Sequence, residues 1–274
     1  MNTQPILVLG GTGKTGRRIV ERLQARGTPV RVGSRSAQPS FQWEAPDSWT
    51  DALRDVSAVY ISYYPDLAAP GAADTIERFT DLAVKSGVKR LVLLSGRGEP
   101  EAQRCEDIVR KSGVEFTLLR ASWFSQNFSE NYLLEPLLAG EVALPAGNVG
   151  EPFVDADDIA DVAVEALTDA RHAGQLYELT GPRLWTFAEA IAEIARATGR
   201  DIRYVQMPVH EYEGALKEAG LPAELVSLIA YLFGEVLDGR NAFVANGVTR
   251  ALGRPPRDFA DYVRYTSRTG VWGS

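Results

Sequence analysis

Cysteine and histidine are scarce in this sequence of 274 residues. Cys105 is the only cysteine, so an internal disulfide is excluded and a reducing compartment is expected. The only histidines are His172 and His210, and neither stands beside the carboxylates at residues 155–158. Without a histidine nearby, we read those carboxylates as helix-start residues and expect no metal site.

Long apolar runs are absent as well. The longest nearly unbroken one, residues 225–233, is far too short to span a membrane. No charged and then apolar leader precedes the first predicted strand, so we expect no signal peptide and a cytoplasmic protein. The net charge of −7 disfavours nucleic-acid binding. Neither a membrane nor a nucleic acid is therefore expected as a partner.

A glycine-rich turn stands between a predicted strand and a predicted helix near the start of the chain. Residues 6–9 are all apolar, and residues 10–16 read Gly-Gly-Thr-Gly-Lys-Thr-Gly. Such a turn lets backbone N–H groups converge at a helix N-terminus, where the diphosphate of a dinucleotide binds. Two glycine frames fit, namely Gly10, Gly13 and Gly16, or Gly11, Gly13 and Gly16. A nucleoside-triphosphate loop is excluded because its first glycine would fall at Val8.

The second predicted strand, residues 29–32, indicates which dinucleotide binds. It ends in Gly33-Ser34-Arg35-Ser36, and no Asp or Glu stands between Glu21 and Glu44 to take the ribose hydroxyls of NAD. Arg35 between two hydroxyls suits the 2′-phosphate of NADP(H), although an arginine in a polar loop is the alternative. The basic residues that crowd positions 14–35 would add a positive field around the turn.

Strands and helices alternate along the first 120 residues. This alternation predicts an α/β fold of the Rossmann type, a doubly wound parallel sheet with helices on both faces. Residues 41–43 are expected to form its third strand. A Gly- and Pro-rich stretch at 139–151 suggests an NAD(P)-binding domain over 1–150 and a smaller C-terminal α/β substrate lobe over 151–274, interleaved with the sheet. The residues expected to contact the cofactor are Gly10, Thr12, Gly13, Lys14, Thr15, Gly16, Ser34, Arg35, Ser36, Trp43, Tyr63, Tyr64, Ser95 and Gly96.

Several segments resemble the NmrA-like branch of the atypical short-chain dehydrogenases. They are residues 10–16, 32–36, 87–95, 112–120 with 123–128, 152–160 and 259–262. Within that branch the chain is most similar to reductases of the agroclavine dehydrogenase and festuclavine synthase type and to their bacterial relatives, which suggests secondary metabolism. The resemblance covers nearly the whole chain and implies NAD(P) binding on a Rossmann fold with a smaller substrate lobe.

The sequence departs from carbonyl-reducing short-chain dehydrogenases at the catalytic acid. Those enzymes generally use a Tyr-x-x-x-Lys pair, but no tyrosine here has lysine four residues later. Residues 99–106, where that helix should run, contain no tyrosine, lysine or histidine, so the catalytic residues stay unknown. Hydride transfer to an iminium or a conjugated quinone does not need that acid.

An aromatic segment follows the predicted strand 115–119. If residues 121–132 are helical, most of Trp123, Phe124, Asn127 and Phe128 share one face, which forms either core or a wall of the substrate site. We take these four as substrate-binding residues, with Asn127 orienting a carbonyl or amide.

These observations predict an NADP(H)-dependent oxidoreductase that reduces a conjugated or aromatic small molecule, such as a quinone, an iminium or a polyketide intermediate. The alternative is an NmrA-like redox sensor that binds the dinucleotide without turnover and acts through a protein partner. The chain is expected to be a monomer or a homodimer.

Overall fold

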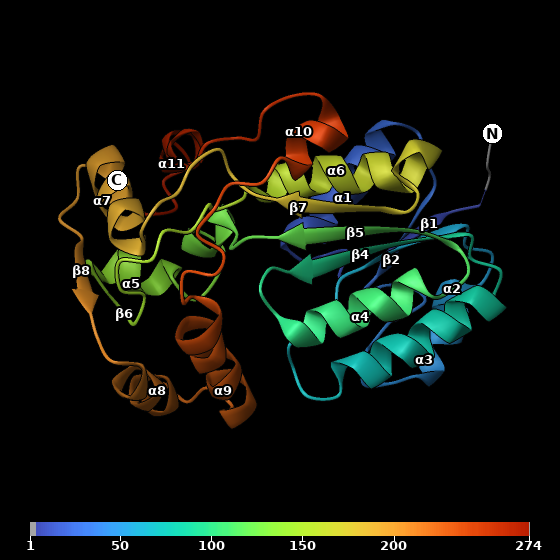
Figure 1. Cartoon of the computed structure of the whole chain (residues 1–274), viewed down its shortest axis with the longest axis horizontal. Coiled ribbons are helices and arrows are strands. Elements are labelled where there is room, and N and C mark those ends of the chain that lie inside the picture. The colour runs from blue at the N-terminus through green and yellow to red at the C-terminus, as the bar shows by residue number, and fades with distance from the viewer. Residues whose placement is uncertain (1–3, 274) are drawn as a thin grey trace. The chain divides into compact units, whose positions relative to one another are not determined.

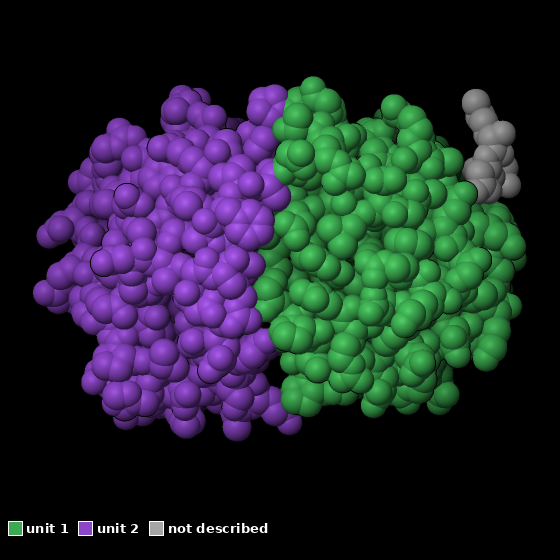
Figure 2. Space-filling model, in the orientation of Figure 1, with its two compact units in different colours: residues 1–121, 156–179, 246–254 green, residues 122–155, 180–245, 255–274 purple. Residues whose placement is uncertain are grey.

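The computed structural model describes residues 4–273, which fold into two compact units (Figure 2). Unit 1 comprises residues 1–121, 156–179 and 246–254, and unit 2 comprises residues 122–155, 180–245 and 255–274. The chain passes between the units several times. The predicted single boundary at residue 150 is therefore wrong, because segments from the second half of the sequence complete the first unit.

Unit 1 contains a six-stranded, all-parallel sheet in the order β2-β1-β3-β4-β5-β7. Its strands are β1 (Ile6–Leu9), β2 (Val30–Gly33), β3 (Ala58–Ile61), β4 (Arg90–Gly96), β5 (Glu115–Ala121) and β7 (Gln175–Leu179). The predicted doubly wound α/β fold is confirmed. The predicted strand at residues 41–43 is wrong, and β7 completes the six instead.

Helices cover both faces of this sheet (Figure 1). Those of unit 1 are α1 (Lys14–Ala25), α2 (Asp47–Leu53), α3 (Ala72–Lys85), α4 (Pro100–Arg110), α6 (Ala156–Thr168) and α10 (Gly247–Leu252), with a short 3-10 turn η2 (Ala170–His172). Helices α1 and α6 lie together on one face, and α3 and α4 lie together on the other. Strands β1 and β3 are buried along their whole length, which their unbroken apolar sequences require in a sheet covered on both sides.

Unit 2 contains the two-stranded parallel sheet β6 (Glu141–Leu144) and β8 (Arg203–Gln206). Its other elements are η1 (Ser125–Phe128), α5 (Leu134–Ala139), α7 (Phe187–Thr198), α8 (Val209–Glu218), α9 (Ala223–Tyr231), the π-helical turn η3 (Leu232–Val236) and α11 (Phe259–Ser267). Its core is aromatic, with Phe128, Phe153, Phe187 and Phe259 in mutual ring contact. Among the described helices of the chain, none is long and apolar enough to cross a membrane.

Candidate functional site

The glycine turn after β1 has the close packing that its sequence predicts. Gly10 has a φ of +64°, a conformation that favours glycine, and the amide of Gly13 donates to the carbonyl of Gly10 at 2.8 Å. A Cβ on Gly16 would lie 2.1 Å from the carbonyl oxygen of Gly10. Helix α1 can therefore approach the turn this closely only because residue 16 lacks a side chain.

Helix α1 begins directly beyond this turn, with no side-chain cap. The residue before it, Gly13, has no side chain to accept the free amides of the first helical turn, and Thr12 and Gly13 are both exposed. Free amides at an exposed helix N-terminus, together with the helix dipole, are able to bind an anion such as a diphosphate. The hydroxyl of Thr15 accepts a hydrogen bond from the buried Tyr60 hydroxyl at 2.9 Å and keeps its own proton as a donor, so its contact with the cofactor stays a prediction.

The end of β2 lies beside a hollow of about 500 Å³ that Thr12, Ser34 and Ser36 help to line. The two serine hydroxyls lie 3.3 Å apart, and Arg35 between them is exposed. No described residue pairs with the Arg35 guanidinium. The structure thus brings the predicted ribose-side residues together, with their polar groups turned to the surface.

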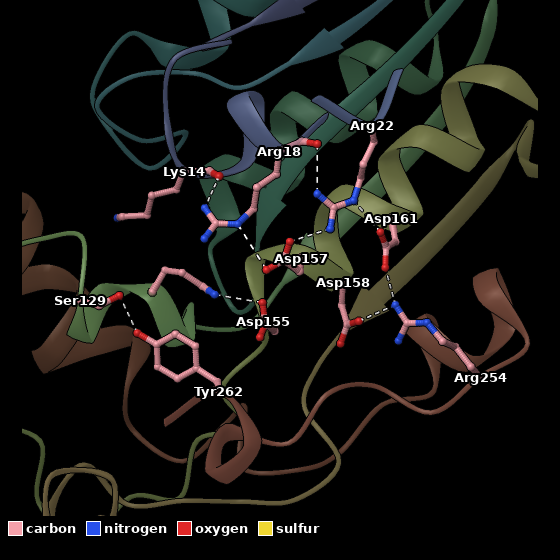
Figure 3. Close-up of polar contacts among 11 residues, drawn as sticks. Lys14, Arg18, Arg22, Ser129, Asp155, Asp157, Asp158, Asp161, Arg254 and Tyr262 are labelled. Carbon is pink, nitrogen blue, oxygen red and sulfur yellow. Dashed lines mark hydrogen bonds and ion pairs between the residues drawn. The ribbon is translucent and has the colours of Figure 1, made fainter. Parts of the chain in front are cut away.

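Arg18 and Arg22 of α1 are ion-paired, which reduces the positive field that the sequence suggested around the turn. Arg22 binds Asp157 at 2.5 Å and Asp161 at 2.6 Å, both on α6, and the guanidinium of Arg18 lies 3.5 Å from Asp157 (Figure 3). These side chains join α1 to α6 across one face of the sheet. The acidic start of α6 therefore serves in ion pairs between helices, beyond the helix-start role that its sequence predicts.

The same network continues to the segment before residue 255. Arg254 binds Asp158 at 2.7 Å and Asp161 at 2.5 Å, and Asp158 is fully buried (Figure 3). Arg254 thus joins the last segment of unit 1 to α6.

The tyrosines after β3 lie next to an aromatic cluster. Trp43 is buried there, 5.0 Å from the Tyr63 ring between centroids, and its indole N–H donates to the Ser62 carbonyl. Tyr64 is 66% exposed. Trp43 thus belongs to the core and supports Tyr63, whereas its contact with an adenine stays a prediction.

The end of β4 carries a buried charged cluster that sequence reasoning missed. The hydroxyl of Ser95 donates to Glu106 at 2.7 Å, and Arg120 on β5 binds both oxygens of Glu106 at 2.9 and 2.5 Å. The hydrogen bonds that Arg120 donates to Glu106 raise the pKa of Arg120. Because the Ser95 hydroxyl is committed to Glu106, Ser95 and Gly96 could meet a cofactor only through backbone atoms or a reoriented Ser95. The missed signal was a carboxylate at a buried position of α4.

The four predicted substrate residues lie in unit 2, and they do not share one helical face. The segment forms only the short 3-10 helix η1. Phe128 is fully buried against Phe153, so its prediction as a substrate-facing residue is wrong. Trp123, Phe124 and Asn127 are half-buried, and Trp123 also packs on Phe187. The change from α-helix to 3-10 helix alters which side chains point together, which explains the error.

One group of potential metal ligands occurs among residues 4–273, at Glu165, Asp169 and His172. Glu165 is paired with Arg26 at 2.6 Å, and Asp169 is paired with Arg171 at 2.7 Å. Since both carboxylate charges are already matched by arginines, the group offers a cation little net attraction.

Comparison with known proteins assigns this chain to a protein family. A family model described as NAD(P)H-binding matches residues 10–170. The uncharacterized oxidoreductase YesF of Bacillus subtilis (strain 168) is 32% identical over 100% of this chain and 98% of its own length. The chain belongs to this NAD(P)H-binding oxidoreductase family. It is an NAD(P)H-dependent reductase, as its resemblance to the NmrA-like branch implies.

Two further similarities, one in sequence and one in structure, support this assignment and the fold. Agroclavine dehydrogenase of Claviceps fusiformis is 32% identical over 97% of this chain and 98% of that protein. The structure of an NADPH-dependent quinone oxidoreductase from Escherichia coli, complexed with NADPH, superimposes with a TM-score of 0.79 at 24% identity, over 95% of this chain and 99% of that one. The second likeness confirms the Rossmann-type fold of this NAD(P)H-binding oxidoreductase.

Proposed function

We propose that this reductase prefers NADP(H) and transfers its hydride to a conjugated or aromatic small molecule, such as a quinone, an iminium or a polyketide intermediate. The observation that carries the cofactor preference is the end of β2, where exposed Arg35 stands between Ser34 and Ser36 beside a hollow. No carboxylate lies between Glu21 and Glu44 to take ribose hydroxyls. A 2′-phosphate there would receive charge-assisted hydrogen bonds.

The pKa values of two buried tyrosines support a hydride acceptor that does not need a tyrosine as proton donor. Carbonyl reduction by a tyrosine requires a lowered pKa, which a nearby lysine provides. Burial instead raises the pKa of Tyr60 and of Tyr262. The Tyr60 hydroxyl donates to Thr15, and the Tyr262 hydroxyl donates to Ser129 (Figure 3). For a quinone or an iminium, positioning the nicotinamide supplies most of what the reaction needs.

The proposed substrate contacts come from unit 2. Trp123 and Phe124 are half-buried, so each keeps part of an aromatic surface that a flat conjugated molecule could cover. The N–H of Trp123 donates to the buried Glu151 at 3.3 Å, and its carbonyl accepts from Val154 at 2.9 Å. This segment is thereby held firmly, as a binding wall requires. The names of agroclavine dehydrogenase and of the quinone oxidoreductase agree with such a substrate class.

An acceptor panel tests this proposal. NADPH oxidation is followed with quinones, iminium salts and polyketide-like aromatics, and with simple ketones as the control class. We expect turnover with conjugated acceptors and almost none with simple ketones, which need a proton delivered in the transition state. No oxidation by any acceptor, with tight NADPH binding retained, would contradict the reductase proposal and favour a sensor that acts through a protein partner.

A further inference from the structure

Two glutamates near the end of β4 are buried, but only one has a cationic partner. Glu106 is 1% exposed and is bound by Arg120 and Ser95. Glu99, the residue before α4, is 6% exposed and is hydrogen-bonded to the carboxyl of Asp66, which follows β3. A buried acid whose neighbour is another acid needs a different explanation from a buried ion pair.

The position of the Glu99 side chain is tightly defined. A Cβ built on Gly96 would lie 2.1 Å from its Oε1 atom, so the carboxyl lies directly against the backbone at the end of β4. Within residues 4–273, no amide, hydroxyl or amine donates to its Oε2 atom. Asp66 is itself fixed, because its Oδ1 atom accepts from the Ala68 amide at 2.8 Å.

Glu99 is buried and Asp66 is half-buried. Ionising both hydrogen-bonded carboxyls there is unfavourable, whereas one proton between them satisfies both. Burial, followed by the charge of Asp66, raises the pKa of Glu99 to about 9, and burial also raises the pKa of Asp66. The pair therefore retains a proton at neutral pH. That proton is the donor in the hydrogen bond between the two carboxyls.

We propose that Asp66 and Glu99 share one proton, and that this bond joins the loop after β3 to the loop after β4 and positions both for the nicotinamide half of the cofactor. The inference rests on the proposed cofactor site. In a doubly wound sheet the adenosine half lies toward β2, and the nicotinamide half lies across β1 toward the ends of β3 and β4. Both acids are positioning residues. Asp66 acts through the loop that contains Tyr63 and Tyr64, and Glu99 acts through the loop that begins after Gly96, the last residue of β4.

Other ionisable groups near the pair do not account for a change around pH 9. Glu106, on α4, faces Glu99 and is bound by Arg120. Cys105, also on α4, lies near Asp66, and burial raises the pKa of its thiol to about 12. Arg97, in the same loop as Glu99, is buried and lies 3.7 Å from Glu178. The shared proton is thus the group expected to titrate there.

The first test follows thermal and urea unfolding against pH without cofactor. Because the folded protein holds a proton that the unfolded chain releases at the ordinary pKa of a glutamic acid, the contribution of this proton to stability is complete below that pKa and is lost as the pH rises toward 9. This one proton changes the folding equilibrium constant by about tenfold per pH unit. Glu99→Gln should remove that share of the slope, whereas Glu101→Gln, on the exposed face of α4 with Arg104, should keep it. Equal slopes for the unaltered protein and Glu99→Gln would overturn the shared proton.

The second test measures NADPH affinity from pH 7 to pH 10. In the unaltered protein and in Glu101→Gln, affinity should fall by about tenfold per pH unit above the pKa of the pair, as its proton leaves. Glu99→Gln should show no such fall, since its amide can donate to Asp66 at every pH. The positioning role would be overturned if Glu99→Gln lost the pH dependence of stability while the NADPH affinity of the unaltered protein showed no fall at alkaline pH. If the unaltered protein failed to bind NADPH at all, the proposed function would fail, and the unfolding series would still decide on the shared proton.

Discussion

At the carboxyl edge of the unit 1 sheet, the ends of β1 and β2 carry backbone amides and exposed short side chains, whereas the end of β4 lies beside buried ionisable groups. Gly13 and Ser34 belong to the first region. Glu99, Glu106 and Arg120 belong to the second. The first region has donors to offer to an incoming anion. In the second, Arg120 balances the charge of Glu106, and the proton proposed to be shared with Asp66 would leave only one negative charge on the Asp66–Glu99 pair.

This difference has a consequence for mutation. In the first region a substitution changes what a ligand meets while few intramolecular bonds are lost, so affinity should change more than stability. In the second region a substitution leaves a buried charge or donor without its partner, and such groups are expensive to bury alone. The free energy of unfolding should therefore change more than the cofactor affinity, which should change only to the extent that the loops after β3 and β4 move.

The largest effect should come from Gly13→Val. The added Cβ meets only the Gly10 carbonyl oxygen, at 3.2 Å, so the fold should persist, but the side chain fills the space through which a diphosphate reaches the backbone. Losing two or more charge-assisted hydrogen bonds should weaken NADPH and NADH alike by about a thousandfold or more. Calorimetric titration measures this, with thermal unfolding as the check on folding.

Glu21→Ala, on the exposed side of the same helix, is the matched control for Gly13→Val. It should leave both affinities unchanged. Near-normal binding of either cofactor by the valine variant would show that the phosphates bind elsewhere.

The next effect, on stability, should come from Glu106→Gln. Among residues 4–273, the change leaves the partly buried Arg120 with Glu178, at 3.2 Å, as its one remaining ionic partner. Breaking a buried ion pair from one side costs about 3–5 kcal/mol of unfolding free energy. Urea denaturation measures the loss, and Glu101→Gln on the same helix should show almost none. A variant as stable as the unaltered protein would mean that the Glu106 charge contributes nothing to the fold.

Local patterns account for what the sequence predicted correctly. The bounds of helix α7, Phe187–Thr198, follow from such local signals, because Thr186 and Glu189 form a reciprocal cap and Gly199 ends the helix in the left-handed conformation. The glycine turn and the β2 end were predictable for the same reason. Each signal lies within a few neighbouring residues.

The errors and omissions come from contacts between distant residues. Residues 41–43 look like a strand because they are aromatic, but Phe41 and Trp43 are buried in a cluster with Trp49 and Phe79 instead. The ion pair of Arg22 with Asp157 joins residues 135 positions apart. Asp66 and Glu99 come together only because β3 and β4 are neighbours. No periodicity or spacing in the sequence marks these pairs.

The smallest effect should separate the two cofactors rather than remove binding. Arg35→Ala deletes the exposed guanidinium beside Ser34 and Ser36, and a charge-assisted contact to a phosphate contributes about 1.5–3 kcal/mol. NADPH affinity should fall roughly ten- to a hundredfold while NADH affinity and the unfolding temperature stay the same, since NADH carries no 2′-phosphate. Arg54→Ala removes an equally exposed charge from the same unit, where Asp51 is its partner, and should change neither affinity. Calorimetry on both cofactors decides the point. Two results would show that the end of β2 does not recognise the 2′-phosphate: equal affinity of the unaltered protein for NADPH and NADH, or a parallel loss of both affinities in Arg35→Ala. The exposed region would then bind the dinucleotide through its diphosphate alone.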